Sequence, residues 1–134
     1  MDLRKKILIV DDDADFTESL SAFLEAKGFH TLKARDGGEG LKIARLQRPD
    51  LIIMDVVMNE RTEGFFTVQQ LRRVPELQAT PIFVLSSIYS THPEFQISPD
   101  SGWLAHDEFL SKPPDMNDLL GRIRRHLAPK EATA

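Results

Sequence analysis

Three short apolar runs constrain the fold of this chain more than any other feature. They lie at residues 7–10 (ILIV), 51–54 (LIIM) and 82–85 (IFVL), and none alternates between apolar and polar residues. Strands with one buried face alternate, whereas strands covered on both faces form continuous apolar runs. We therefore expect three central strands of a parallel sheet. A chain of 134 residues suits one domain built around such a sheet.

The clearest helix is expected directly after the first run. Its apolar residues recur at i, i+4, i+7 and i+8, which is the spacing of an amphipathic helix. These residues are Phe16, Leu20, Phe23 and Leu24. Gly28 follows them and is expected to end the helix in the left-handed conformation that glycine adopts readily.

The remaining elements complete an alternation of strands and helices. Helices are expected at 38–47, at 64–74 and after an Asp115 cap, and shorter strands at 29–34 and 108–111. Glycines at the start of the 38–47 helix lower its propensity, so its start is expected to be weak. Two prolines interrupt the pattern between the last two strands, where we expect an irregular loop. The class is a doubly wound α/β fold with five parallel strands and helices on both faces.

Composition excludes several kinds of function. A net charge of −4 gives no global positive field for nucleic acid, and the absence of cysteine excludes disulfides and thiol nucleophiles. The apolar runs are far shorter than the roughly 20 residues that cross a bilayer, and the first residues carry no secretion signal. We expect a cytoplasmic protein with no nucleic-acid or membrane partner.

Carboxylates gather where two of the central strands end. Asp11, Asp12 and Asp13 follow the first run, and Asp55 follows the second. Ligands of doubly wound sheets bind at the carboxyl ends of the strands, so these side chains are expected to converge there. Carboxylates this close repel one another unless a cation neutralises them, and such oxygen ligands suit Mg²⁺.

A hydroxyl and an amine are expected at the same edge of the sheet. Ser86 directly follows the third apolar run, and Lys112 follows the last short strand. Acids, Mg²⁺, a hydroxyl and an ammonium group together suit a phosphoryl group. Asp55 stands alone at its strand end, so we expect it to be the nucleophile, with the first-strand pair Asp11 and Asp12 holding the metal.

Four segments resemble the receiver domain of two-component response regulators. They are ILIVDDDADF, PDLIIMDVVM, TPIFVLSS and EFLSKPP, in the order and approximate spacing of that family, and the resemblance covers about residues 5–127. It implies a flavodoxin-like sheet of strand order 2-1-3-4-5, with residues 1–128 as the receiver domain and 129–134 as a short polar tail.

The resemblance also implies a role for each matching residue. Asp55 would be the phosphoacceptor, Ser86 the switch hydroxyl and Lys112 the phosphate contact. Phe109 would be the aromatic that changes rotamer on activation. The Mg²⁺ ligands would be Asp12 directly, Asp11 through water, Asp55, and the backbone carbonyl of Val57. Val57 and Ile88 would flank the path of the attacking water, and because both are apolar we expect slow loss of phosphate.

By resemblance the chain is a signalling module and not a conventional enzyme. A histidine kinase or a histidine phosphotransfer protein would supply the phosphoryl group, as in a phosphorelay. The signal would pass to a downstream protein target through a switched surface, and a homodimer is a further option. Departures from the family pattern lie near the acceptor, where Asn59 replaces a common proline, and after the switch residue, where Ser87 replaces a smaller residue.

Two alternatives stay open at this point. Beside a phosphorylated receiver, the first alternative is a degenerate receiver that binds partners without phosphorylation, and the second is a small phosphohydrolase of the haloacid dehalogenase type. The second would take its nucleophile from the first strand, which leaves Asp55 unexplained. Turnover of a phosphoester that is lost in Asp11→Asn and retained in Asp55→Asn would favour the hydrolase.

Overall fold

A computed structural model describes residues 4–55, 63–86 and 107–128 of the chain. Its five strands form one parallel sheet in the order β2-β1-β3-β4-β5, which confirms the expected topology. The strands are β1 (Lys6–Val10), β2 (His30–Ala34), β3 (Leu51–Asp55), β4 (Ile82–Ser86) and β5 (Glu108–Ser111). The three continuous apolar runs thus occupy the three central positions of the sheet.

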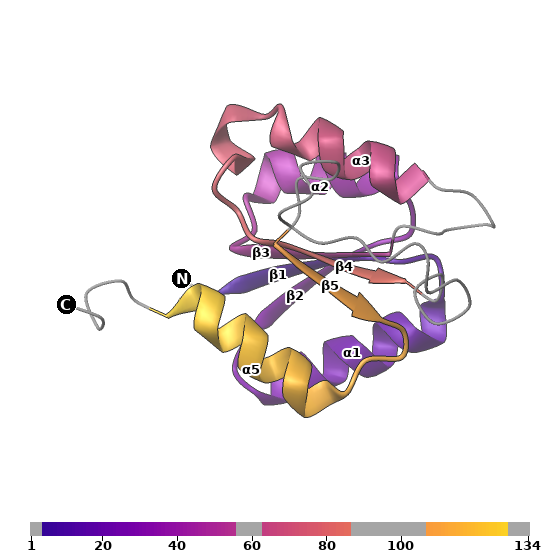
Figure 1. Cartoon of the computed structure of the whole chain (residues 1–134), viewed down its shortest axis with the longest axis vertical. Helices are drawn as coiled ribbons and strands as arrows, with labels where there is room; N and C mark the ends of the chain where they lie inside the picture. Colours follow the sequence, from indigo (N-terminus) through magenta and orange to yellow (C-terminus); the bar gives the residue numbers. More distant parts are fainter. Residues whose placement is uncertain (1–3, 56–62, 87–106, 129–134) are drawn as a thin grey trace.

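Helices cover both faces of this sheet (Figure 1). On one face lie α2 (Gly37–Gln47) and α3 (Glu63–Arg72), and on the other α1 (Ala14–Ala26) and α5 (Met116–Leu127). The helix α3 ends at Arg72, two residues before the predicted end at 74, and a short 3-10 helix, η1 (Pro75–Leu77), follows it. No helix in the described part of the chain is long and apolar enough to cross a membrane.

Each central strand contributes alternate residues to two separate cores, which explains why its sequence is apolar throughout. Leu8, Val10, Ile52 and Met54 pack with residues of α2 and α3. Their neighbours along β1 and β3 pack with α1 and α5. Both faces of the sheet are therefore covered by helices and buried, as continuous apolar runs predict.

Aspartate caps fix where three helices begin. The side chains of Asp13, Asp36 and Asp115 accept hydrogen bonds from backbone N–H groups in the first turns of α1, α2 and α5. The cap at Asp115 was expected from the sequence. At the other end of α1, Gly28 has φ of 96°, the left-handed conformation predicted for it.

The glycines of α2 have a packing role that propensity alone does not reveal. A Cβ atom on Gly40 would lie 2.8 Å from Cγ2 of Val10. A Cβ atom on Gly37 would overlap the Thr67 hydroxyl on α3. Glycine therefore lets α2 approach β1 and α3 closely. The helix begins at Gly37, one residue before the predicted start, because Asp36 caps it.

Glu25 joins the end of α1 to the amino edge of the sheet. Its carboxylate accepts hydrogen bonds from the backbone N–H of Thr31 at 2.7 Å and the Thr31 hydroxyl at 2.9 Å. The guanidinium of Arg4 lies 2.8 Å from its other oxygen. The Thr31 backbone and hydroxyl hydrogen bonds, with help from Arg4, outweigh burial and lower the pKa of Glu25 below the ordinary 4.5.

This lowered pKa predicts a pH dependence of stability. The unfolded chain binds the proton more readily than the folded chain, so Glu25 contributes stability above pH 4.5 that is lost as the pH falls through the lowered value. We expect Glu25→Gln to destabilise the protein at neutral pH, and the difference from the wild type to shrink in acid. Urea unfolding of both proteins at neutral pH and at a pH below the lowered pKa of Glu25 measures this difference. A difference that stays constant with pH would contradict it.

Candidate functional site

The predicted carboxylates do converge at the carboxyl edge of the sheet. Asp11 directly follows β1 and Asp55 ends β3, and these two strands pair in register with Val10 opposite Met54. Carboxylate oxygens of Asp11, Asp12 and Asp55 all lie within 4.8 Å of one another. The rule that ligand sites lie beyond the carboxyl ends of parallel strands therefore located this cluster correctly.

Burial strengthens the repulsion between the carboxylates of the cluster. Asp11 is 3% exposed and Asp55 is 4% exposed, so water does little to screen the repulsion between them. The ammonium of Lys112 lies 2.9 Å from Oδ2 of Asp11 and 3.4 Å from Oδ2 of Asp55. The backbone N–H of Asp13 also donates to Asp11. One lysine from beyond β5 thus serves as counter-ion to two buried acids.

The environment of Lys112 keeps it charged. Burial favours the neutral amine, but the hydrogen bonds and attraction of Asp11 and Asp55 outweigh burial and raise the pKa of Lys112 above its ordinary value. The ammonium also lies 4.7 Å from the centre of the Phe16 ring, where the face of the ring attracts a cation. The sequence pattern places Phe16 only on the apolar face of α1, and no pattern in the chain signals this second contact.

Of the other predicted site residues, two lie on strands of the sheet and two lie outside the described part of the chain. Ser86 is the last residue of β4 and pairs with Ser111, but its side chain lies outside the described part. Phe109 is half-buried and packs against the core under α2 and α3. Val57 and Ile88 lie outside the described residues, as do most of the proline-interrupted segment and the 129–134 tail.

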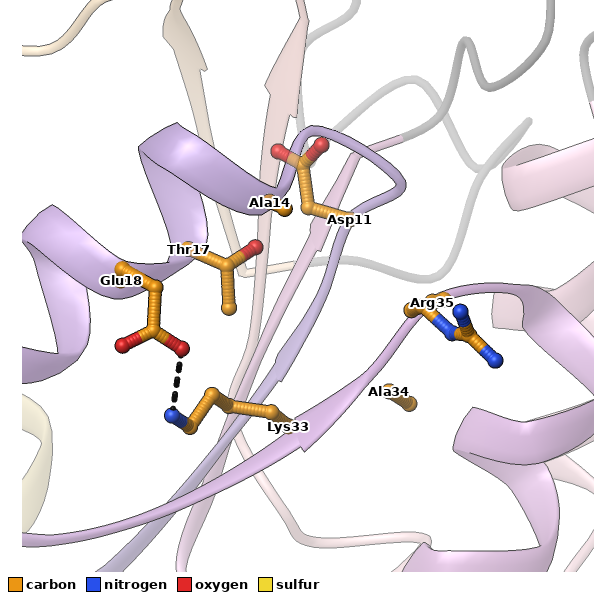
Figure 2. A pocket seen from close by; sticks show the side chains of 7 residues that line it. All are labelled: Asp11, Ala14, Thr17, Glu18, Lys33, Ala34 and Arg35. Carbon is orange, nitrogen blue, oxygen red and sulfur yellow. Dashed lines mark hydrogen bonds and ion pairs between the residues drawn. The ribbon is translucent and has the colours of Figure 1, made fainter.

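A small hollow of about 200 Å³ lies on the β2 side of Asp11. Figure 2 shows the ion pair of Glu18 and Lys33 beside it, with Asp11 at its other end. Thr17 also lines it, and the Thr17 hydroxyl is buried with no hydrogen-bond partner among the described residues. An unpaired buried hydroxyl costs stability, so this position is not optimised for folding.

We therefore expect Thr17→Val to leave the free energy of unfolding unchanged or to raise it by about 1 kcal/mol, because valine has the same shape without the hydroxyl. Thr31→Val is the matched control. It removes a hydroxyl that lies 2.6 Å from Ser21 and donates to Glu25, and it should cost about 1–3 kcal/mol. Equal losses in the two variants, measured by urea unfolding, would show that the Thr17 hydroxyl is satisfied.

The donor set of the cluster fits a hard divalent cation. Three carboxylates supply only oxygen atoms, within 4.8 Å of one another, and oxygen is the ligand that Mg²⁺ prefers. No other group of three metal-ligating side chains occurs among the residues that the structure describes. The fold and this cluster together define a flavodoxin-like α/β domain with an acidic site where the strand order reverses.

Comparison with known proteins gives the family. Residues 7–124 match the response regulator receiver domain, so the chain belongs to the receiver domain family of two-component response regulators. It is 34% identical over 126 residues to the protein PilH of Pseudomonas aeruginosa, covering 92% of this chain and 98% of PilH. The family model and these relatives give no support to the haloacid dehalogenase alternative.

Other relatives are longer than this chain. It is 36% identical over 129 residues to the response regulator MprA of a Mycobacterium species, which covers 94% of this chain but 53% of MprA. The transcriptional regulator RpaA of Synechocystis is 34% identical over 89% of this chain and 47% of its own length. The chain thus spans about half the length of these two regulators.

Solved structures agree with the fold. The chemotaxis protein CheY4 of Vibrio cholerae has a TM-score of 0.77 at 30% identity, covering 92% of this chain and 99% of CheY4. The response regulator TrrA of Thermotoga maritima, solved in complex with Mg²⁺ and BeF, has a TM-score of 0.75 at 26% identity, covering 92% and 99%. The order 2-1-3-4-5 and the flavodoxin-like class are thereby confirmed.

Proposed function

We propose that the chain accepts a phosphoryl group on Asp55, from a histidine kinase or a histidine phosphotransfer protein, in a Mg²⁺-dependent reaction. One observation carries the proposal: the Lys112 ammonium lies 3.4 Å from a carboxylate oxygen of Asp55, beside the further carboxylates of Asp11 and Asp12. A nucleophilic oxygen, a fixed positive charge and a hard-cation donor set are the parts that phosphoryl transfer requires. The family and the Mg²⁺ and BeF complex of TrrA support it.

Each residue then has a defined task in the transfer. A carboxylate oxygen of Asp55 forms a bond to phosphorus as the bond from phosphorus to the donor's histidine nitrogen breaks, and the electron pair returns to that nitrogen. Lys112 moves its ammonium from Asp11 toward the phosphoryl oxygens and neutralises part of their charge. Asp12, Asp11 through water, Asp55 and the Val57 carbonyl would hold Mg²⁺. When bound, Mg²⁺ offsets the negative charge of the carboxylates and of the incoming group.

The phosphorylated state would alter a protein-binding surface. Ser86 ends β4, the strand beside β3, and Phe109 lies on β5, which pairs with β4 on its other side. Their movement toward and around the phosphate would favour one of two surface conformations. The output is then binding to a downstream protein target and not turnover of a substrate. The chain acts in the cytoplasm as a signalling module, with dimerisation as a further output.

Intact mass measurement tests the acceptor. The protein is incubated with acetyl phosphate and Mg²⁺, alongside Asp55→Asn and a sample containing a chelator. We expect one phosphoryl adduct in the wild type and none in either control. A folded wild type that binds Mg²⁺ and gains no adduct would overturn the proposal in favour of a receiver that binds partners without phosphorylation.

The same adduct gives a test of its lifetime. Val57 and Ile88 are apolar and, by family position, flank the path of water to the acyl phosphate, so we expect the adduct to persist for minutes or longer after the donor is removed. Mass measured at intervals follows its loss. A lifetime of seconds would contradict this expectation without affecting the assignment of Asp55.

A further inference from the structure

A second hollow lies at the opposite edge of the sheet from the carboxylates. It has a volume of about 480 Å³ and is lined by Arg45, Arg48, Arg73, Val74, Pro75 and Glu76. The first two arginines lie at the end of α2, just before β3, and the other residues lie between α3 and β4. Its position at the amino ends of β3 and β4 separates it from the phosphoacceptor by the length of the strands.

The guanidinium groups of this hollow differ from that of the neighbouring Arg72 in their contacts with the described residues. These three groups make no hydrogen bond or ion pair with any residue that the structure describes. Arg72, the immediate neighbour of Arg73, behaves differently, because it binds Asp107 at 2.7 Å and the carbonyl of Thr80 at 2.6 Å. Arg72 therefore stabilises the fold. Arg45, Arg48 and Arg73 are instead exposed around one hollow, in a protein of net charge −4.

The helix dipoles explain only part of this arrangement. A basic residue in the last turn of α2 or just after α3 is favoured by the negative end of each helix. That effect does not require the groups to share one hollow. Arg48 is also the only non-glycine residue among those described with positive φ, at 48°, a conformation that glycine adopts at less cost. An arginine thus stands at a position where backbone conformation alone favours glycine.

The geometry points to a binding site for a small phosphate monoester of about nucleotide size, and we propose this as a second ligand site of the protein. Guanidinium groups match phosphate oxygens in pairs. Three of them with Glu76 leave the hollow with two net positive charges, and a phosphate monoester carries about −1.5 to −2 near neutral pH. Val74 and Pro75 offer an apolar wall for the body of the ligand, and Glu76 accepts a hydrogen bond from it. The volume lies within the range of about 300–1,000 Å³ typical of small-molecule sites.

An acidic protein segment is the competing occupant. Leu46 is 71% exposed in the same turn of α2 and offers such a segment an apolar contact. A concave site of this volume favours a compact ligand over an extended chain, which would lie across a flat surface. The two occupants differ in what they require, because a peptide supplies carboxylates and no phosphate.

Nuclear magnetic resonance titration of the full chain tests the site. Adenosine monophosphate is added in buffer that contains a chelator, with adenosine as the matched probe that lacks phosphate. We expect amide shifts at residues 44–48 and at Arg73, Val74 and Glu76 with the monophosphate only. Shifts confined to the residues around Asp55, or the absence of shifts at these two segments, would overturn the proposal.

Variants then separate the hollow from general charge attraction. Arg45→Gln with Arg73→Gln should weaken binding by at least about tenfold, because each loses charge-assisted hydrogen bonds. Arg124→Gln with Arg125→Gln removes the same charge from exposed positions on α5 and should leave binding unchanged. Equal weakening in both pairs would overturn the proposal, as would tighter binding of a polyglutamate peptide than of the monophosphate.

Discussion

Replacing Lys112 with methionine is expected to lower the free energy of unfolding in metal-free buffer by about 3 kcal/mol, because two buried carboxylates lose the ammonium that pairs with both of them. This is near the lower end of the range for broken buried ion pairs, since the Lys112 side chain remains 17% exposed. Methionine keeps most of the aliphatic volume, so the loss reports charge and not packing. Urea unfolding measures it.

Lys33→Met is the matched control for this experiment. The Lys33 ammonium lies 2.8 Å from Glu18, as close as Lys112 lies to Asp11, but both side chains of that pair are well exposed. Exposed ion pairs contribute only about 0–1 kcal/mol, so this variant should lose little. Equal losses in the two variants would mean that burial of the carboxylates does not set the cost.

Two further changes locate the cause of the loss. In the Lys112→Met background, Asp55→Asn removes one of the repelling carboxylates and should recover stability. Added Mg²⁺ should also recover stability, and by more than it stabilises the wild type, because the cation replaces the missing charge. If neither change recovers stability, the role of Lys112 would be packing and not charge.

The second large effect is expected at Gly40. An alanine Cβ at this position would lie 2.8 Å from Cγ2 and 3.2 Å from Cγ1 of Val10, a buried residue of β1 whose branched side chain has little freedom to move. We expect Gly40→Ala to lower the free energy of unfolding by about 1–3 kcal/mol, the usual cost of overpacking a core. Helix propensity alone predicts that the free energy of unfolding rises by up to about 1 kcal/mol. The sign of the change therefore tests whether α2 packs closely against β1.

Gly121→Ala on α5 is the control, because a Cβ there meets nothing within 4 Å. It should raise the free energy of unfolding by about 0.5–1 kcal/mol. Thermal and urea unfolding of both variants give the comparison. Stabilisation by both alanines would show that α2 moves away from β1 without cost. Since Val10 directly precedes Asp11, we also expect Gly40→Ala to slow formation of the phosphoryl adduct.

The central sheet was predictable because its sequence signal depends on burial alone. Residues 7–10, 51–54 and 82–85 are apolar at every position since each strand feeds two cores, and no distant partner has to be known to recognise this. The caps Asp13 and Asp115 were predictable for a similar reason, because each acts within its own first turn.

Features that depend on two distant segments were not predictable in the same way. Gly37 and Gly40 were interpreted as weak helix formers, and only the packing of α2 on β1 and α3 shows why glycine stands there. The strand-end rule placed Asp11, Asp55 and Lys112 at one edge, but it gave no distance and did not show that Lys112 pairs with both acids. The contact of Lys112 with the Phe16 ring was not predictable from the sequence around either residue.

The pairing of Lys112 with Asp11 has a consequence for synthesis of the protein, because the two residues are separated by 101 positions. A ribosome releases the acidic half of the site early and its lysine only after β4, so a nascent chain carries uncompensated aspartates until β5 docks. The complete arrangement of carboxylates and lysine therefore forms only at the end of folding. A stalled or shortened chain that ends before β5 retains the proposed acceptor Asp55 but lacks the Lys112 ammonium that pairs with it.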